Sequence, residues 1–313
     1  MINLFNINNH TIDTSKYSNL LHDSIVTEFE ATIANYVGAK HAVSFNSATN
    51  AIFLALLNKK TTITVPSMIP PVVLNAIITS GNQYKFKDDV EWVGNSYVLH
   101  DFGEYKIVDS AQKIEKNQFI NECNNDDLLV FSFYPTKPIG SCDGGMIVSN
   151  DLDKISKLKE LALNGMTYSN NNWERKIKLP GYKMYMNSIQ ADIGLQNFKV
   201  YPAKLKRLAE IRNRYNNALG YDNTSSHLYR VDVENRKSFR DYLFSNGINT
   251  GIHYEATHTN PVYAIEGKNW SYFDCPITNV ASKKTVSIPF QETLLPSEVE
   301  CIIKKIKEYN AYK

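Results

Sequence analysis

The sequence is poor in the features that mark several classes of protein. Its four cysteines, Cys123, Cys142, Cys275 and Cys301, form no C-x-x-C pair and have no histidine nearby at ligand spacing. This scatter argues against a disulfide framework and a metal site, and it is typical of a reduced, cytoplasmic protein. The formal net charge is +2, which is too close to balance to favour nucleic acid or an anionic membrane as a partner.

Long apolar runs are absent as well. No stretch reaches the roughly 18 residues that a membrane helix needs. The first ten residues, MINLFNINNH, lack the basic and apolar regions of a signal peptide. We therefore expect a cytoplasmic protein. The sequence also has no G-x-G-x-x-G or Walker A motif, so nucleotide-binding folds of those kinds have no support.

What is present is an ordinary globular composition, with 43% apolar and 21% charged residues in 313 positions. That length suffices for one large domain and a smaller one. In the first half, helical patterns alternate with short apolar runs. Helices are expected at 24–37, 49–57, 70–79 and 152–163, and strands at 41–45, 61–65, 106–108, 128–133 and 146–148. Strands without polar alternation suit a mostly parallel sheet covered on both faces, which predicts an α/β domain.

The alternation of helical and apolar segments ends after residue 164. Residues 167–185 lack periodicity, which predicts a long functional loop. A helix at 187–198 should be interrupted by Pro202 before a long second helix begins. The remaining pattern is that of a small α+β unit, with strands at 228–233, 250–253 and 286–289 and helices at 236–245 and at the C-terminal end. We predict a large domain at 1–200, and a linking helix with a small domain at 201–313.

Three groups in the large domain occupy positions, at strand ends and at a helix start, that are typical of ligand-binding or catalytic residues. Residues 46–50 lie between a strand and a helix, where free N–H groups suit a phosphate, although Ser and Thr there also serve as plain N-caps. Asp109 ends an apolar strand, at the edge where open α/β sheets bind ligands, or it caps the next helix. Lys137 follows a buried strand and precedes the glycine-rich turn 140–145. On that segment alone, a solvated surface lysine is the simpler interpretation.

Taken together, the three groups match the needs of pyridoxal 5'-phosphate (PLP). A helix N-terminus binds the phosphate, an aspartate keeps the pyridine nitrogen protonated, and a lysine forms the Schiff base.

Over nearly its whole length the chain resembles the DegT/DnrJ/EryC1/StrS sugar aminotransferases of fold-type I. The matching segments, in order, are VTEFEATIANYVGAKHAVSFNSATNAIFLAL, IVDSAQ, FSFYPTKPIGSCDGGMIVSND, GYKMYMNSIQADIGLQNF, TGIHYEATHTNPVY and SIPF. The resemblance implies that Lys137 is the Schiff-base lysine and that Asp109 pairs with the pyridine nitrogen. It further implies that Gln112 lies near the ring hydroxyl and that His253 lies near the substrate. The phosphate ligands that it implies are Ala48, Thr49 and Ser132.

The resemblance also implies a reaction and an assembly. The family moves an amino group from glutamate to a keto group on a nucleotide-linked deoxysugar, often for surface polysaccharide synthesis. Its members are typically homodimers with shared active sites, so the 167–185 loop is expected to reach the partner's site.

Several positions depart from the family pattern. Lys183 stands where an asparagine commonly reaches the neighbouring subunit's cofactor phosphate, and a lysine can do so as a point charge. Tyr185 replaces a common arginine, so it becomes a candidate substrate residue. Pro70 takes the place of a ring-stacking aromatic. The 87–106 segment is short, so a strand and a helix are expected to be missing and the site to be more open. Trp92 and Tyr97 are either ligand-binding aromatics or, as the simpler interpretation, packing residues.

Two alternatives to the aminotransferase remain open at this point. The first is a PLP-dependent sugar dehydratase, although members of that kind carry histidine where this chain has Lys137. The second is a non-catalytic regulatory protein that binds PLP or a sugar.

Overall fold

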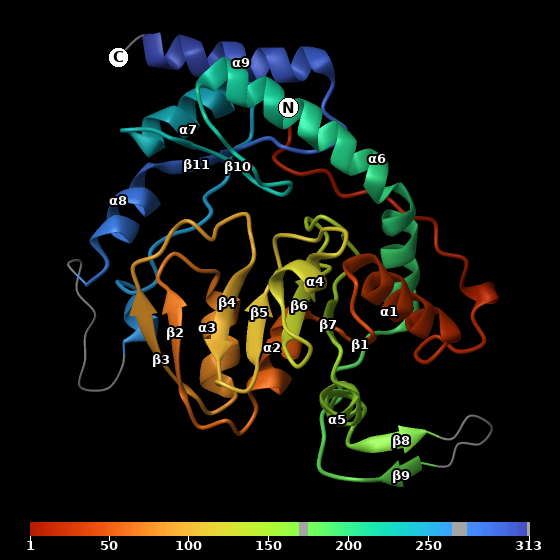
Figure 1. The fold of residues 1–313 in the computed structure, drawn as a ribbon. Helices are drawn as coiled ribbons and strands as arrows, with labels where there is room; N and C mark the ends of the chain where they lie inside the picture. Colours follow the sequence, from red (N-terminus) through yellow and green to blue (C-terminus); the bar gives the residue numbers. More distant parts are fainter. Residues whose placement is uncertain (169–174, 265–273, 312–313) are drawn as a thin grey trace.

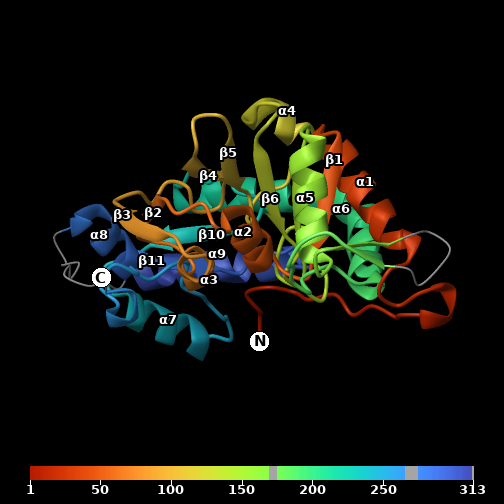
Figure 2. The same ribbon diagram turned by 90° about the horizontal axis from the view of Figure 1, so that it is seen from below.

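The computed structural model describes residues 1–168, 175–264 and 274–311 (Figure 1). Its centre is a five-stranded sheet. The strand order is β1 (His41–Phe45), β7 (Gly145–Ser149), β6 (Leu128–Ser132), β5 (Lys106–Asp109) and β4 (Tyr97–Asp101). A parallel pair, β2 (Thr62–Pro66) and β3 (Gln83–Lys87), lies beside β4 and extends the layer (Figures 1 and 2).

The strand directions are mixed. Strands β5 and β6 run parallel, as do β2 and β3, whereas β1–β7, β6–β7 and β4–β5 are antiparallel. The predicted α/β class is confirmed, but the expectation of mostly parallel pairing was wrong for this sheet. Apolar strands that are buried on both faces look alike in sequence whichever way they run, because both faces carry apolar side chains.

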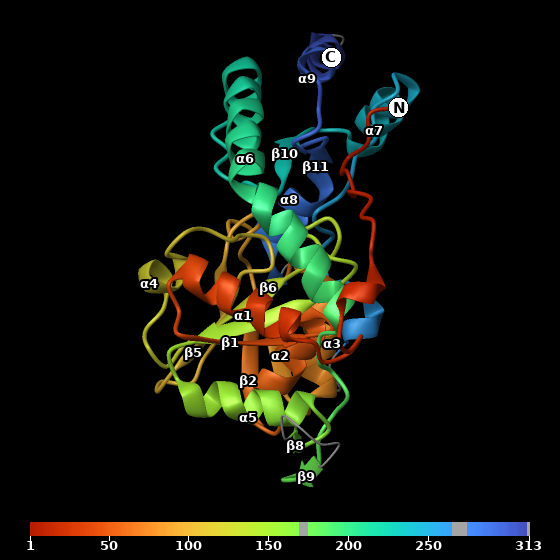
Figure 3. The same ribbon diagram turned by 90° about the vertical axis from the view of Figure 1, so that its right-hand side faces the viewer.

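Helices cover both faces of the sheet, as the apolar strands predicted (Figure 3). On one face, α2 (Ala48–Leu56), α3 (Pro71–Thr79) and α5 (Leu152–Ala162) pack against β-strand residues such as Ile107 and Val130. On the other face, α1 (Ser24–Val37), the short α4 (Gln118–Glu122) and the first half of α6 (Ser188–Leu219) pack against Val108, Leu129 and Phe131.

Helix α6 runs from the sheet into a second core without a break. Pro202 lies inside it, so the prediction that this proline separates two helices was wrong. A proline costs a helix about 3 kcal/mol. Here, burial on both sides of Pro202 offsets that cost, because Tyr201 packs under the sheet and Leu208 packs in the second core. Figure 3 shows α6 changing direction along its length, as expected for an internal proline.

The second core is formed by the C-terminal third of the chain. Strands β10 (Tyr229–Asp232) and β11 (Thr285–Ile288) pair antiparallel. They pack with α6, α7 (Arg236–Ser245) and α9 (Pro296–Ala311), while α8 (Pro276–Lys284) lies to one side (Figure 1). The expected strand at 250–253 is only an isolated bridge between Gly251 and Ser287. Short 3-10 turns occur at Thr14–Lys16 and Pro261–Tyr263.

Two segments differ from their predicted form. Within 167–185, β8 (Met166–Tyr168) pairs antiparallel with β9 (Arg175–Ile177), so part of the expected loop is a hairpin, and residues 169–174 lie outside the described residues. The 87–106 segment contains β4, which occupies the position between β2 and β5. The expectation of a missing strand was therefore wrong, whereas residues 88–105 contain no helix, as expected.

Neither a membrane-spanning helix nor a metal-binding group of His, Cys, Asp or Glu residues occurs in the described ranges.

Candidate active site

The N-terminus of α2 lies against the start of β7. Ser47 is the N-cap, and its Oγ accepts a hydrogen bond from the Asn50 N–H at 3.2 Å. Within the described residues, the N–H groups of Ala48 and Thr49 have no hydrogen-bond partner. At Gly145, a Cβ would lie 2.5 Å from the Ala48 backbone nitrogen. The helix can approach this closely only because residue 145 has no side chain.

Ser132 lies directly beside this helix start. It is the last residue of β6 and pairs with Gly145 across the strands. Among the described residues, its Oγ accepts one long hydrogen bond, of 3.4 Å, from the Tyr134 N–H. Two backbone N–H groups and a hydroxyl therefore gather at one place, as an anion such as phosphate requires.

Lys137 follows β6 in a turn closed by a hydrogen bond from its own N–H to the Tyr134 carbonyl, at 2.8 Å. Burial lowers the pKa of its amine to about 8, and the charge of Asp109 opposes this shift. With that pKa, about one-tenth of the amine is neutral and nucleophilic at pH 7. The side chain is half-buried rather than exposed, and burial shifts its pKa, so the sequence-based alternative of an ordinary solvated surface lysine does not hold.

Asp109, at the end of β5, is 4% exposed. Its Oδ1 accepts from the Ala111 N–H at 2.9 Å and its Oδ2 accepts from the Tyr97 hydroxyl at 2.9 Å. Burial raises the pKa of this carboxyl, while these two hydrogen bonds and the positive charge of Lys137 lower it. Asp109 is thus a buried acid whose ionised form depends on a small number of named donors.

Both the oxygen and the nitrogen of the Gln112 side-chain amide are hydrogen-bonded. The Gly94 N–H donates to Oε1 at 2.7 Å, and Nε2 donates to the Tyr254 hydroxyl at 2.8 Å. The Tyr254 ring lies parallel to the Trp92 ring, with centroids 6.1 Å apart and planes at 5°.

Two histidines face Lys137 from the C-terminal third. His253 Nδ1 lies 2.8 Å from Ser287 Oγ. Burial and the charges of Lys137 and Arg230 lower the pKa of His253 to about 4. His227 is buried against the Phe5 ring, and burial with the Lys137 charge lowers its pKa well below the usual range. Both imidazoles are therefore neutral near pH 7.

Lys183 and Tyr185 lie elsewhere. The Tyr185 ring is 4.6 Å from the His22 ring, and the charges of Arg175 and Lys183 help to lower the pKa of His22 after burial. Tyr185, His22 and Arg175 line a groove of about 930 Å³ beside α1 and α5. Among the described residues, no hydrogen bond or ion pair joins Lys183 or Tyr185 to Lys137.

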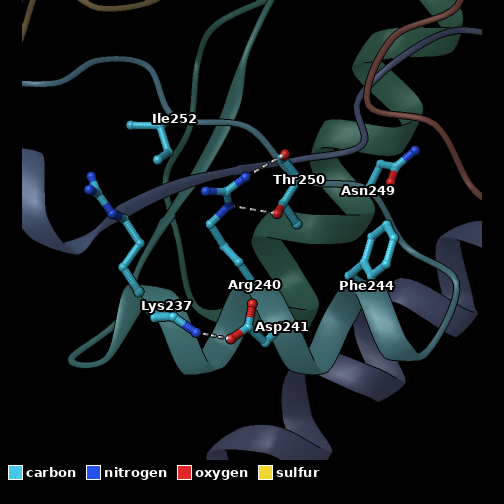
Figure 4. Close-up of a pocket in the computed structure, with 8 residues that line it drawn as sticks. Lys237, Arg240, Asp241, Phe244, Asn249, Thr250 and Ile252 are labelled. Atoms are coloured by element: carbon cyan, nitrogen blue, oxygen red, sulfur yellow. Dashed lines mark hydrogen bonds and ion pairs between the residues drawn. The ribbon is translucent and has the colours of Figure 1, made fainter.

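A second groove, of about 510 Å³, lies on α7 and the chain that follows it (Figure 4). Its cations have partners: Lys237 pairs with Asp241 at 2.7 Å, and Arg240 donates to Thr250 Oγ1 at 3.1 Å. None of the predicted site residues lines it.

Sequence reasoning missed several residues of the site. Packing was the simpler interpretation of Tyr97 and Trp92, and both lie in the buried core. In addition, Tyr97 bonds Asp109 directly and Trp92 stacks on Tyr254. Gly94 and Arg230 were not singled out. The only signal available was the short 87–106 segment, which was taken to open the site, whereas its residues close over Asp109 and Gln112.

Comparison with known proteins gives a consistent picture. The profile of the DegT/DnrJ/EryC1/StrS aminotransferase family matches residues 6–90 and 107–307. Two similar proteins are the spore coat polysaccharide biosynthesis protein SpsC of Bacillus subtilis and a UDP-4-amino-4,6-dideoxy-N-acetyl-beta-L-altrosamine transaminase of Campylobacter jejuni. The first is 28% identical, with 90% of this chain and 89% of that protein covered. The second is 25% identical, with 80% and 83% covered.

The fold is also that of a solved structure. The sugar aminotransferase Spr1654 from Streptococcus pneumoniae, described as putative and determined in its PLP form, superposes with a TM-score of 0.80. It is 18% identical, and 98% of each chain is covered. Residues 91–106 lie between the two matched parts of the family profile.

Proposed function

The chain belongs to the DegT/DnrJ/EryC1/StrS aminotransferase family and is an aminotransferase, and we propose that it uses PLP to move an amino group from glutamate to a nucleotide-linked keto sugar. The activities for which its relatives are named support a sugar-nucleotide substrate, and one relative is named for polysaccharide biosynthesis. The observation that carries the proposal is that the charges of Lys137 and Asp109 act on each other, while Ser132 at the end of β6 pairs with Gly145, against which α2 begins.

The residues present fit PLP. Ala48 and Thr49 offer unused N–H groups, Ser132 offers a hydroxyl, and Gly145 leaves room for the close approach of α2. We assign the phosphate to this cradle, the pyridine nitrogen to Asp109, and the ring hydroxyl side to Gln112. Lys183 of the partner subunit is our candidate for a further phosphate contact.

When bound, PLP supplies an electron sink that stabilises negative charge on the substrate carbon. The side chains of this protein would do the rest. Lys137 provides the attachment amine and then moves the proton at that carbon, for which a pKa near 8 is well matched to neutral pH. Asp109, kept ionised, holds the proton on the pyridine nitrogen. Neutral His253 and His227 add no competing positive charge.

The proposal also covers the domain boundaries, the oligomeric state and the cellular location. The domains are assigned as residues 1–200 and 201–313, which agrees with the separate apolar cluster of the C-terminal part. The assembly is assigned as a homodimer with shared sites. The location is assigned as cytoplasmic, for which four free cysteines are supporting evidence.

Lys137→Ala tests the proposal. We expect the wild-type protein to show the absorption band of bound PLP and to lose it on addition of glutamate. The variant should bind PLP without that band and lose turnover by at least about a thousandfold, since a covalent catalyst is removed. The matched control is Lys87→Ala, a surface lysine paired with Asp89, which should behave as wild type.

Circular dichroism would verify that Lys137→Ala is folded. A folded variant that keeps the wild-type rate would contradict the role of Lys137, and a wild-type protein that binds no PLP would contradict the proposal as a whole.

A further inference from the structure

Residues 91–106 fall outside the family match, yet they contact the centre of the site. The segment forms a tight turn and then strand β4, which runs antiparallel to β5. In this register Tyr97 is directly opposite Asp109. The chain therefore brings a residue of the unmatched segment beside the acid that the proposed function assigns to the pyridine nitrogen.

Three contacts tie this segment to the site. The Tyr97 hydroxyl donates to Asp109 Oδ2 at 2.9 Å, and the Gly94 N–H donates to Gln112 Oε1 at 2.7 Å. The Trp92 ring stacks on Tyr254, whose hydroxyl accepts from Gln112. The first two act directly on Asp109 and Gln112, which the proposed function places at the cofactor ring, and the third acts on Gln112 through Tyr254.

The backbone at Gly94 is specific for glycine. Its φ is +95°, and a Cβ there would lie 2.8 Å from the Ser225 Cβ. The turn is thus packed between Gln112 and Ser225 of the C-terminal part, and it leads directly into β4, whose register places Tyr97 opposite Asp109.

We propose that residues 92–97 are a positioning clamp for the cofactor ring, in which Tyr97 keeps Asp109 ionised and oriented while Gly94 orients Gln112. The inference rests on the proposed function, because it gives these side chains their ligand. Tyr97 is a positioning residue, since it acts on the cofactor only through Asp109.

The electrostatics of Asp109 give Tyr97 this role. The groups that face the carboxyl are the Ala111 N–H, the Tyr97 hydroxyl, the Lys137 amine and, at longer range, Tyr254. Besides the Lys137 charge, two hydrogen-bond donors of this chain, the Ala111 N–H and the Tyr97 hydroxyl, oppose the effect of burial on the Asp109 carboxyl. The pKa of Tyr97 lies well above its usual value because of burial and the Asp109 charge, so its hydroxyl stays a donor at every pH of interest.

The test is Tyr97→Phe, which removes one oxygen atom and keeps the ring. Its matched control is Tyr84→Phe. Tyr84 and Tyr97 are both 8% exposed, and the Tyr84 hydroxyl also makes one buried hydrogen bond, to the Tyr263 carbonyl at 2.7 Å. Tyr84 lies on β3, and within the described part of the chain its hydroxyl and ring contact Tyr263 and Phe86 rather than Asp109 or Gln112.

Two readouts other than turnover decide the question. We expect the dissociation constant of PLP from the Tyr97→Phe apoprotein to rise about tenfold, because a hydrogen bond to a charged group is lost. The acid limb of the bound-cofactor absorption should move to higher pH, because an Asp109 that lacks this donor takes up a proton more easily. Tyr84→Phe should change neither quantity, whatever it does to thermal unfolding.

A double-mutant cycle provides a second check. In an Asp109→Asn background, Tyr97→Phe should have little further effect on PLP binding, because no charge remains to be stabilised. Equal behaviour of Tyr97→Phe and Tyr84→Phe in a wild-type protein that binds PLP would overturn the clamp alone. A wild-type protein that binds no PLP would overturn the proposed function and the clamp with it.

Discussion

Burial controls the charge state of the residues around Lys137. Lys137 has a lowered pKa, Asp109 has a raised one that is partly restored by its donors, and two histidines are neutral. Lys137, Asp109 and His253 were candidates from sequence, whereas His227 was not. Their charge states were not predictable, because a pKa shift depends on burial and on neighbours that arrive from distant parts of the chain.

The surroundings of the Arg230 side chain lead to a testable prediction. It pairs with Ser287 across β10 and β11, so both side chains point to the same side, where the Ser287 hydroxyl meets His253. Within the described residues Arg230 makes no hydrogen bond or ion pair, and Asp232 and Glu91 act on it only at longer range. A half-buried guanidinium with unused donors suits a carboxylate or phosphate.

We expect Arg230→Gln to raise KM about tenfold and to lower kcat less. A rise for glutamate would identify a carboxylate as the ligand, and a rise for the sugar nucleotide would identify its phosphates. The control is Arg214→Gln, which removes an exposed ion pair with Glu300 and should leave KM unchanged. Unchanged KM values for both substrates in Arg230→Gln would disprove the assignment.

Contacts between elements determine the shape of the site. Helix α2 approaches β7 because Gly145 has no Cβ, and β4 reaches β5 because the connection between them, residues 102–105, is short. The helix spans were predicted to within a residue or two for α1, α2, α3, α5 and α7, since each has a periodic apolar face. Strand direction was not predictable, and neither was the continuity of α6 through Pro202, because both depend on packing partners.

Gly145→Ala tests the contact between α2 and β7. The new Cβ would lie 2.5 Å from the Ala48 nitrogen, so the start of α2 must shift away from Ser132. We expect a loss of about 2 kcal/mol in the free energy of unfolding and about tenfold weaker PLP binding. Chemical denaturation and PLP titration would measure the two effects.

The control for that experiment is Gly81→Ala. Its Cβ would meet no atom within 4 Å, and its φ is +81°, so it carries only the backbone strain of about 1–2 kcal/mol. Gly81→Ala should keep wild-type PLP affinity. If Gly145→Ala also keeps it, then α2 does not hold the phosphate.

For the whole molecule, the arrangement of Lys183 is the informative feature. Lys183 is exposed, and it lies with Arg175 near His22, on the side of the groove beside α1 and α5. This is where a second subunit would have to bind if Lys183 is to reach the partner's phosphate. The predicted shared site can therefore be tested by exchanging subunits.

We expect mixed dimers of Lys137→Ala and Lys183→Ala subunits to recover activity. A mixed dimer contains one site with both lysines intact, so random assortment restores about a quarter of the sites. Lys137→Ala mixed with Asp109→Ala is the control and should not recover, because both side chains belong to one subunit's site. A mixture without recovery in the first case would show that Lys183 acts within its own subunit or not at all.

The sequence by itself determined the α/β class, most helix spans, the family resemblance, and the identity of Lys137, Asp109, Gln112 and the 46–50 turn as candidates. These depend on local patterns and on ordered motifs, which the chain carries wherever it folds. Only the tertiary structure decided that Tyr97 bonds Asp109, that Gly94 bonds Gln112, and that Arg230 points toward His253. The physical reason is that strand register and burial bring these groups together, and neither is written in the spacing of residues along the chain.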